Sequence, residues 1–138
     1  NVHAFHAIAT ANGGFAVGWS SKYKTNTFGI YAYNTNMATF DSTGTELGRT
    51  RLGTASGPND SQEVDLVQLD NGQIVAAWQQ YYYVGQLTSA PHYRVVNPDA
   101  TPVTADITLP GSQYTYTGSG AWGAGVAIAK LGNGNAVI

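Results

Sequence analysis

An Asn-Gly pair set among alternating apolar residues occurs three times in this chain, and the repeat constrains the fold more than any other feature. The pairs are Asn12-Gly13, Asn71-Gly72 and Asn133-Gly134. The second pair follows the first by 59 residues (71 − 12), and the third follows the second by 62 (133 − 71). Asn-Gly between alternating runs is the strongest short-range signal for a β-hairpin, and its usual type I′ turn needs positive φ at both central residues. The sequence therefore predicts one hairpin type at three places, with type I′ turns.

Matching apolar residues flank these turns. Seven residues before each asparagine come Phe5, Val64 and Val126. After the turn, the first two copies alternate apolar and small residues and end in Trp19 and Trp78, whereas the third copy reaches Ile138 before any tryptophan. We expect Trp19 and Trp78 to occupy equivalent positions and to pack in a core.

A second hairpin follows in each of the first two copies. The stretch Met37–Leu47 aligns without gaps with Tyr93–Val103, and both read as strand, polar turn, strand. Leu52 and Leu109 then end each unit in a short apolar stretch. The units span approximately residues 1–59 and 60–121, with a partial third at 122–138. No stretch carries a sustained helical period, so few helices are expected.

Two hairpins repeated about every sixty residues indicate an all-β protein made of four-stranded antiparallel sheets. This pattern is typical of β-propeller blades, which stack so that each sheet covers its neighbour. Small residues between the large ones permit such close packing: Ala16, Gly18, Ala76 and Ala77. The sequence thus predicts two full blades and a partial third. The alternative is a β-sandwich whose hairpins happen to look alike.

The stretches Gly29–Gly48 and Val64–Gln80 together resemble the tandem propeller-like repeats of large secreted bacterial surface proteins and adhesins. In those repeats a Val-Val-x-Trp-like strand is followed by a Phe-Asp-x-x-Gly hairpin. The resemblance implies fold far more than function. The glycine- and aspartate-rich calcium repeats that often accompany such regions are missing, and so are Asp-x-Asp-x-Asp-Gly loops. Bound calcium is therefore not implied, and no metal or cofactor is expected.

Composition limits the possible partners. The formal net charge is −2 and only 10% of residues are charged, which argues against nucleic acid and against a polybasic membrane patch. No apolar run approaches the about 18 residues of a membrane-spanning helix. Cysteine is absent, so disulfides are excluded. The surplus of glycine and tyrosine, 17 and 9 residues, is typical of extracellular β-proteins and favours a secreted or cell-surface location.

Several aromatic residues fall outside the strand pattern and are candidates for ligand contact. They are Tyr81, Tyr82, Tyr83, Tyr114, Tyr116 and Trp122. Successive strand residues point to opposite faces, so at least one of the three consecutive tyrosines faces away from a core. Aromatic rings beside neutral hydrogen-bonding groups suit hydroxyl-rich ligands such as sugars. The alternatives are cross-strand aromatic packing for the tyrosines and a plug between blades for Trp122.

Metal binding and catalysis have weak support. His3 and His6 point to opposite faces of a strand, which makes a poor chelate, and His92 is isolated in the sequence. Glu63 and Asp65 share one side of a strand without a histidine placed near them. No serine has the setting of a hydrolase nucleophile. A glycosidase pair of carboxylates from distant loops stays open as an alternative. We therefore expect a protein that is not an enzyme.

The sequence thus favours a non-catalytic, carbohydrate-binding or adhesion module of lectin type, with a glycan or cell-surface polysaccharide as partner. The alternative is a structural repeat of an extracellular fibre, filament or surface layer. Because the third unit reaches only its first hairpin, we expect the chain to self-associate or to belong to a longer polypeptide. Asn59 begins a formal glycosylation sequon.

Overall fold

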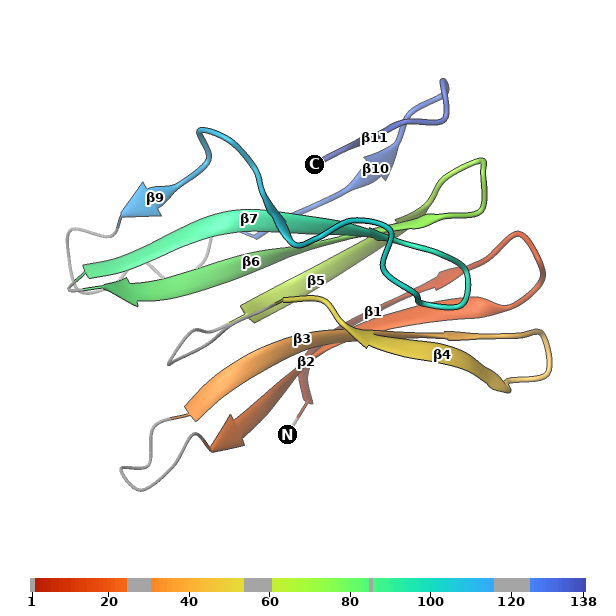
Figure 1. The fold of residues 1–138 in the computed structure, drawn as a ribbon, viewed down its shortest axis with the longest axis horizontal. Helices are drawn as coiled ribbons and strands as arrows, with labels where there is room; N and C mark the ends of the chain where they lie inside the picture. The colour runs from red at the N-terminus through yellow and green to blue at the C-terminus, as the bar shows by residue number, and fades with distance from the viewer. Residues whose placement is uncertain (1, 25–30, 54–60, 85, 116–124) are drawn as a thin grey trace.

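The computed structural model describes residues 2–24, 31–53, 61–84, 86–115 and 125–138, and all regular structure in them is β-strand (Figure 1). The first sheet consists of β1 (Val2–Ala9), β2 (Phe15–Lys24), β3 (Tyr31–Phe40) and β4 (Glu46–Arg51). The second sheet consists of β5 (Ser61–Gln68), β6 (Ile74–Val84), β7 (Gln86–Val96), β8 (Ile107–Thr108) and β9 (Tyr114–Thr115). A separate hairpin is formed by β10 (Ala129–Lys130) and β11 (Ala136–Val137).

Both sheets are antiparallel meanders, so the prediction of an all-β chain of antiparallel sheets is confirmed. The first has the order β1-β2-β3-β4, and the second has β5-β6-β7-β8 with β9 also paired to β7. The sheets lie face to face, and the β10–β11 hairpin lies on the other side of the second sheet (Figure 1). The sheets of the described residues do not close into a ring, and their face-to-face packing also fits the sandwich alternative.

The repeat seen in the sequence is reproduced in strand register. Phe5 pairs with Trp19 between β1 and β2, and Val64 pairs with Trp78 between β5 and β6. On the other side of each tryptophan lie Asn36 and His92, which align with each other in the second-hairpin match. The end of each unit matches too. Leu52 donates its backbone N–H to the carbonyl of Thr35, and Leu109 donates to the carbonyl of Pro91.

The predicted type I′ turns are wrong, although the hairpins themselves form. Within each Asn-Gly pair only the glycine has positive φ, with values of 81°, 84° and 82°. The Gly13 N–H donates to the Thr10 carbonyl (3.0 Å), and the Thr10 N–H donates to the Gly14 carbonyl (2.9 Å). This is a type I turn followed by a glycine bulge. Each asparagine instead accepts the N–H two residues on with its side chain, which favours a right-handed backbone there.

The hydrophobic core lies between the first and second sheets. Its buried members are Ala16, Met37, Leu52, Val64, Leu66, Ile74, Ala76, Trp78 and Val96. Gly18 shows how closely the sheets approach, because a Cβ added there would lie 2.8 Å from a methyl carbon of Val64. The prediction that Trp19 and Trp78 are both core residues is therefore right for only one of them. Trp78 is fully buried in this core, whereas Trp19 lies on the opposite face of its sheet and is only partly buried.

Asp65 on β5 connects all three repeat units. Its Oδ1 lies 2.6 Å from Nδ1 of His6 on β1, and its Oδ2 accepts the backbone N–H of Ile128 at 2.9 Å. The Leu66 N–H also donates to Oδ1, at 2.9 Å. The expectation that no histidine lies near Asp65 is thus wrong, because the face-to-face packing of β1 on β5 brings His6 to it.

Removing the Asp65 carboxylate should destabilise the fold because it takes away bonds to both neighbouring units. We expect Asp65→Ala to lower the free energy of unfolding by about 1–3 kcal/mol. The matched control is Asp70→Ala, since Asp70 forms an exposed ion pair with Lys130 (2.7 Å) and its loss should cost at most about 1 kcal/mol. Urea unfolding of the two variants tests this. Equal effects would contradict the role given to Asp65.

Gly48 on β4 lies against the turn that follows β7. A Cβ added at Gly48 would lie 1.9 Å from the carbonyl oxygen of Asp99, so any side chain must push the two sheets apart. We expect Gly48→Ala to destabilise the chain by about 2 kcal/mol or more. Gly132→Ala is the control, because nothing lies within 4 Å of its added Cβ, and it should change stability by less than about 0.5 kcal/mol. Thermal unfolding of both variants would show whether this contact is as tight as described.

Candidate functional site

A buried polar chain runs from Asp106 through His92 to Tyr82. Nδ1 of His92 lies 2.5 Å from Oδ1 of Asp106, and Nε2 of His92 contacts the Tyr82 hydroxyl. The Thr108 hydroxyl lies 3.3 Å from the same Nε2. The His92 and Asp106 side chains are only 7% and 11% exposed. The sequence-based view of His92 as isolated is therefore wrong.

Strand pairing explains why these residues meet. His92 pairs with Trp78 on β6 and with Thr108 on β8, so its ring is held between two neighbouring strands. Its ring centroid lies 5.8 Å from that of Trp78 and 5.7 Å from that of Tyr82. The three aromatic rings share the sheet face on which the core lies. The polar chain therefore continues the core toward the far end of β6 and β7.

The Asp106 carboxylate can only accept hydrogen bonds, and this fixes the direction of the other hydrogen bonds in the polar chain. The Asp106 carboxylate accepts from Nδ1–H of His92, which leaves Nε2 as the acceptor for the Tyr82 hydroxyl. Burial raises the pKa of Tyr82, and the negative charge of Asp106 raises it further. The phenol consequently keeps its proton at neutral pH. Tyr82 thus acts as a fixed hydrogen-bond donor rather than as a nucleophile.

Tyr82 also forms one wall of a surface hollow of about 520 Å³. The hollow is lined by Tyr82, Thr88, Ala90, Thr108 and Gln113. Its lining combines an aromatic ring, two hydroxyl groups and a carboxamide, and it includes no charged side chain. A neutral ligand rich in hydroxyl groups matches these donors and acceptors.

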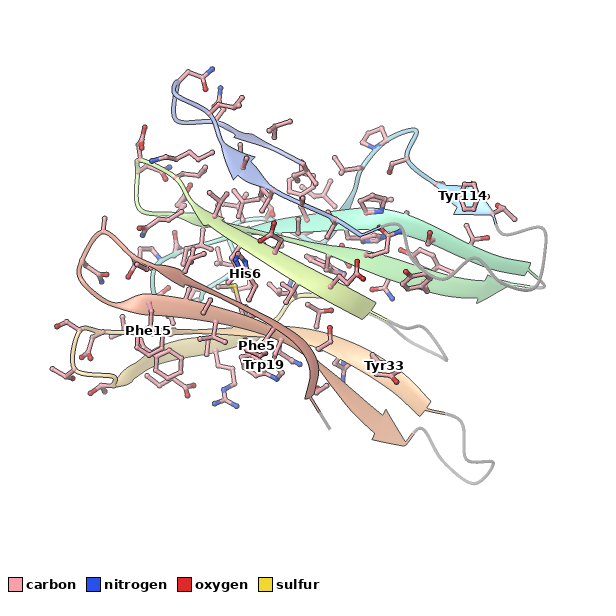
Figure 2. The ribbon with its side chains drawn as sticks, turned by 180° about the vertical axis from the view of Figure 1, so that it is seen from behind. Phe5, His6, Phe15, Trp19, Tyr33 and Tyr114 are labelled. Carbon is pink, nitrogen blue, oxygen red and sulfur yellow. The ribbon has the colours of Figure 1, made fainter. Side chains whose placement is uncertain are left out.

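Tyr114 on β9 follows the lining residue Gln113 directly and is 57% exposed. It pairs with Ser89 of β7 at the edge of the second sheet (Figure 2), so its ring lies on the sheet face opposite to that of Thr88 and Tyr82. Tyr114 therefore does not line the hollow, although its exposed ring is a separate surface on which a sugar ring can stack. We refer to the hollow with its five lining residues as the tyrosine hollow.

The six aromatic candidates from the sequence fare differently. Tyr82 lines the tyrosine hollow, whereas Tyr81 is buried on the opposite face of β6, and Tyr114 is exposed on that opposite face of the sheet. The side chain of Tyr83 lies outside the described residues, as do Tyr116 and Trp122. Sequence reasoning missed Thr88, Thr108 and Gln113. These residues come from three separate segments, and no local pattern sets them apart.

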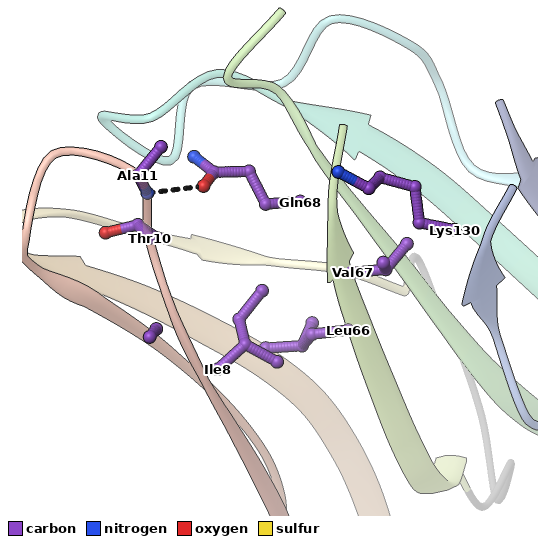
Figure 3. A pocket seen from close by; sticks show the side chains of 8 residues that line it. Ile8, Thr10, Ala11, Leu66, Val67, Gln68 and Lys130 are labelled. Carbon is purple, nitrogen blue, oxygen red and sulfur yellow. Dashed lines mark hydrogen bonds between the residues drawn. The ribbon is translucent and has the colours of Figure 1, made fainter. Parts of the chain in front are cut away.

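A second hollow, of about 470 Å³, lies where the first strands of the three units approach one another (Figure 3). Its lining runs from β1 and the turn after it, through β5, to Lys130 on β10. The Gln68 side chain accepts the Ala11 N–H (2.7 Å) and donates to the Gly72 carbonyl (3.0 Å). Lys130 is paired with Asp70. These polar groups are committed to joining the units, so this hollow is a weaker ligand site than the tyrosine hollow.

The described residues offer little support for a metal centre. No group of three or more His, Asp or Glu side chains there is placed to hold an ion. His6 pairs with Asp65 instead, and the side chain of His3 is not among those described. In the same part of the chain, no helix is long and apolar enough to cross a bilayer.

Comparisons with known proteins identify no relative of this chain. No protein-family model matches the chain, and no curated protein or solved structure matches it significantly. The interpretation of the site therefore depends on its own chemistry.

The raised pKa of Tyr82 provides a direct test of the buried chain. Asp106→Asn should lower this pKa because it removes the nearby negative charge, while burial continues to hold it above the ordinary value. Alkaline titration followed by tyrosinate absorbance measures the shift, and Tyr82→Phe identifies which component belongs to Tyr82. An Asp106→Asn titration identical to that of the parent chain would contradict the arrangement.

The same shift predicts how stability depends on pH. A phenol whose pKa is raised on folding stabilises the folded state only while it keeps its proton. The contribution of Tyr82 is therefore fully present below about pH 10, the ordinary tyrosine pKa, and is lost as the pH rises through the folded-state value. Urea unfolding across this alkaline range should show a smaller loss of stability in Tyr82→Phe than in the parent chain.

Proposed function

We propose that this chain is a non-catalytic carbohydrate-binding module of lectin or adhesin type that acts outside the cell. The observation that supports it is the tyrosine hollow, a cavity lined by the neutral side chains of Tyr82, Thr88, Thr108 and Gln113. Sugar hydroxyl groups pair with neutral donors and acceptors, and the apolar face of a sugar stacks on an aromatic ring. A glycan or cell-surface polysaccharide is the partner that this lining favours.

The buried chain beneath the hollow supports binding rather than catalysis. Asp106 and His92 hold the Tyr82 hydroxyl in one orientation, which pre-organises the wall of the site. Because burial and Asp106 both raise the pKa of Tyr82, its hydroxyl is a poor nucleophile at neutral pH. The composition, with few charges and many tyrosines, favours secretion or surface display.

We further infer that the sheets are propeller-type blades rather than halves of a sandwich. Two features support this assignment. The equivalent pairs Phe5–Trp19 and Val64–Trp78 have the same register in successive sheets. In addition, Asp65 on β5 bonds to His6 on β1 and to Ile128, directly before β10, as expected when the first strands of the units lie side by side around an axis.

A second candidate function is structural, as a repeat unit of a fibre, filament or surface layer that binds no small ligand. The aromatic residues on the outer face of the first sheet favour it, because Phe5 is 75% exposed. Both functions can belong to one protein, and a direct binding measurement separates them.

A glycan array probed with the folded chain tests the carbohydrate proposal. We expect Gln113→Ala to weaken binding about three- to tenfold, which corresponds to loss of one hydrogen-bonding contact. Tyr33→Ala is the control, because Tyr33 lies on β3 of the first sheet and should leave binding unchanged. Tyr114→Ala and Trp122→Ala test two aromatic candidates outside the hollow in the same assay. Absence of sugar binding by a folded chain would favour the structural function.

A further inference from the structure

The outer face of the first sheet exposes aromatic side chains. Phe5 is 75% and Phe15 is 38% exposed, and Phe15 stacks on Phe40 with their ring centroids 4.7 Å apart. Trp19 lies on the same face, where the Arg49 guanidinium sits 5.5 Å from its ring centroid. Figure 2 shows Phe5, Phe15 and Trp19 on the side facing away from the second sheet, while His6 points between the sheets. We call this surface the aromatic face.

The equivalent face of the second sheet is completely covered. In the repeat, Phe5 corresponds to Val64, Phe15 to Ile74, Trp19 to Trp78 and Phe40 to Val96, and all four counterparts are core residues. They are covered by the small residues Ala16 and Gly18 of the first sheet, with Met37 and Leu52. The structure therefore already contains one example of how such a face is buried. It is buried by the small-residue face of a sheet from the preceding unit.

The opposite end of the molecule carries a candidate for the covering role. Leu131, Val137 and Ile138 of the β10–β11 hairpin are exposed apolar residues, and they also line a hollow of about 590 Å³ between the hairpin and the outer face of the second sheet. Counting along the repeat, Val137 corresponds to Val75 (137 − 75 = 62) and then to Ala16 (75 − 16 = 59), the buried residue that faces the second sheet. In the repeat, Val137 therefore belongs to the face that covers a neighbouring sheet in the first unit, whereas Ile138 belongs to the opposite face.

We propose that the aromatic face is a docking surface for a second copy of this chain, which covers it with its β10–β11 hairpin. The contact repeats the packing of the first sheet on the second, so it joins unlike surfaces of the two copies. Contacts of this head-to-tail kind build rings when the rotation closes and filaments when it does not. Large exposed apolar patches are uncommon on monomers and mark interaction sites. This inference goes beyond carbohydrate binding and does not depend on it.

Sedimentation velocity over a range of concentrations tests the proposal. We expect the parent chain to self-associate, and Phe5→Asp to raise the dissociation constant about tenfold or more, as for removal of one buried aromatic side chain. Phe15→Ser should also raise the dissociation constant. Tyr114→Asp is the control, because it alters an exposed aromatic residue on the other sheet and should leave association unchanged. Circular dichroism establishes that each variant is folded. A monomer at all concentrations, or association insensitive to Phe5→Asp, would overturn the proposal.

Disulfide cross-linking tests how the two copies are oriented. The chain contains no cysteine, so each cysteine variant carries a single thiol. Ala7 corresponds to Leu66, which shares the core cluster with Ala16, the counterpart of Val137. Mixing the Ala7→Cys and Val137→Cys variants under oxidation should therefore give a disulfide-linked dimer. Ala7→Cys alone should stay monomeric in this assay. Dimers from Ala7→Cys alone would indicate that two aromatic faces meet, and would overturn the head-to-tail arrangement. A loss of sugar binding in Tyr114→Ala would leave both results untouched, so the two proposals fail separately.

Discussion

The close approach of Gly18 to Val64 sets the spacing between the two sheets, and the rest of the structure depends on it. With no side chain at Gly18, the Val64 methyl groups reach the backbone of the first sheet, and a Cβ there would lie 2.8 Å from one of them. Interiors are packed as densely as organic crystals, so a spacing fixed at one point limits every other contact between the layers. Gly48 against the Asp99 carbonyl maintains the same spacing between β4 and the turn that follows β7.

This spacing places the first strands of the units side by side and gives Asp65 its role. A carboxylate at that position reaches His6 on one side and the Ile128 N–H on the other. The same packing divides the long strand β6 into two parts. Near the turn, Ile74 and Trp78 face the core, whereas Tyr82 at the far end lies half-buried beside His92 and Thr108. The candidate site is thus the polar continuation of the hydrophobic core along one strand face.

Equivalent positions acquire different roles because they have different neighbours. Trp78 is buried because the first sheet covers it, whereas Trp19, in the same register, is partly exposed, with the Arg49 guanidinium 5.5 Å from its ring centroid. Asn36 and His92 are likewise equivalent in register. Among the described side chains, His92 is joined to the Asp106 carboxylate and the Tyr82 phenol, whereas Asn36 donates to the Ser21 hydroxyl and to the Asn34 carbonyl. The repeat supplies the scaffold, and local substitutions in one copy create the site.

The sequence by itself determined the hairpins, their order and the equivalence of Trp19 with Trp78, because alternation and turn residues act within a few positions. It did not determine the turn type, since the Asn12 side chain bonds the N–H two residues on and leaves positive φ to Gly13 alone. Nor could it separate Tyr81 from Tyr82, or place His92 beside Asp106. Which face of a strand is covered, and which residues meet across strands, depend on register and sheet packing. Those contacts join residues far apart in the chain, and only the tertiary structure decides them.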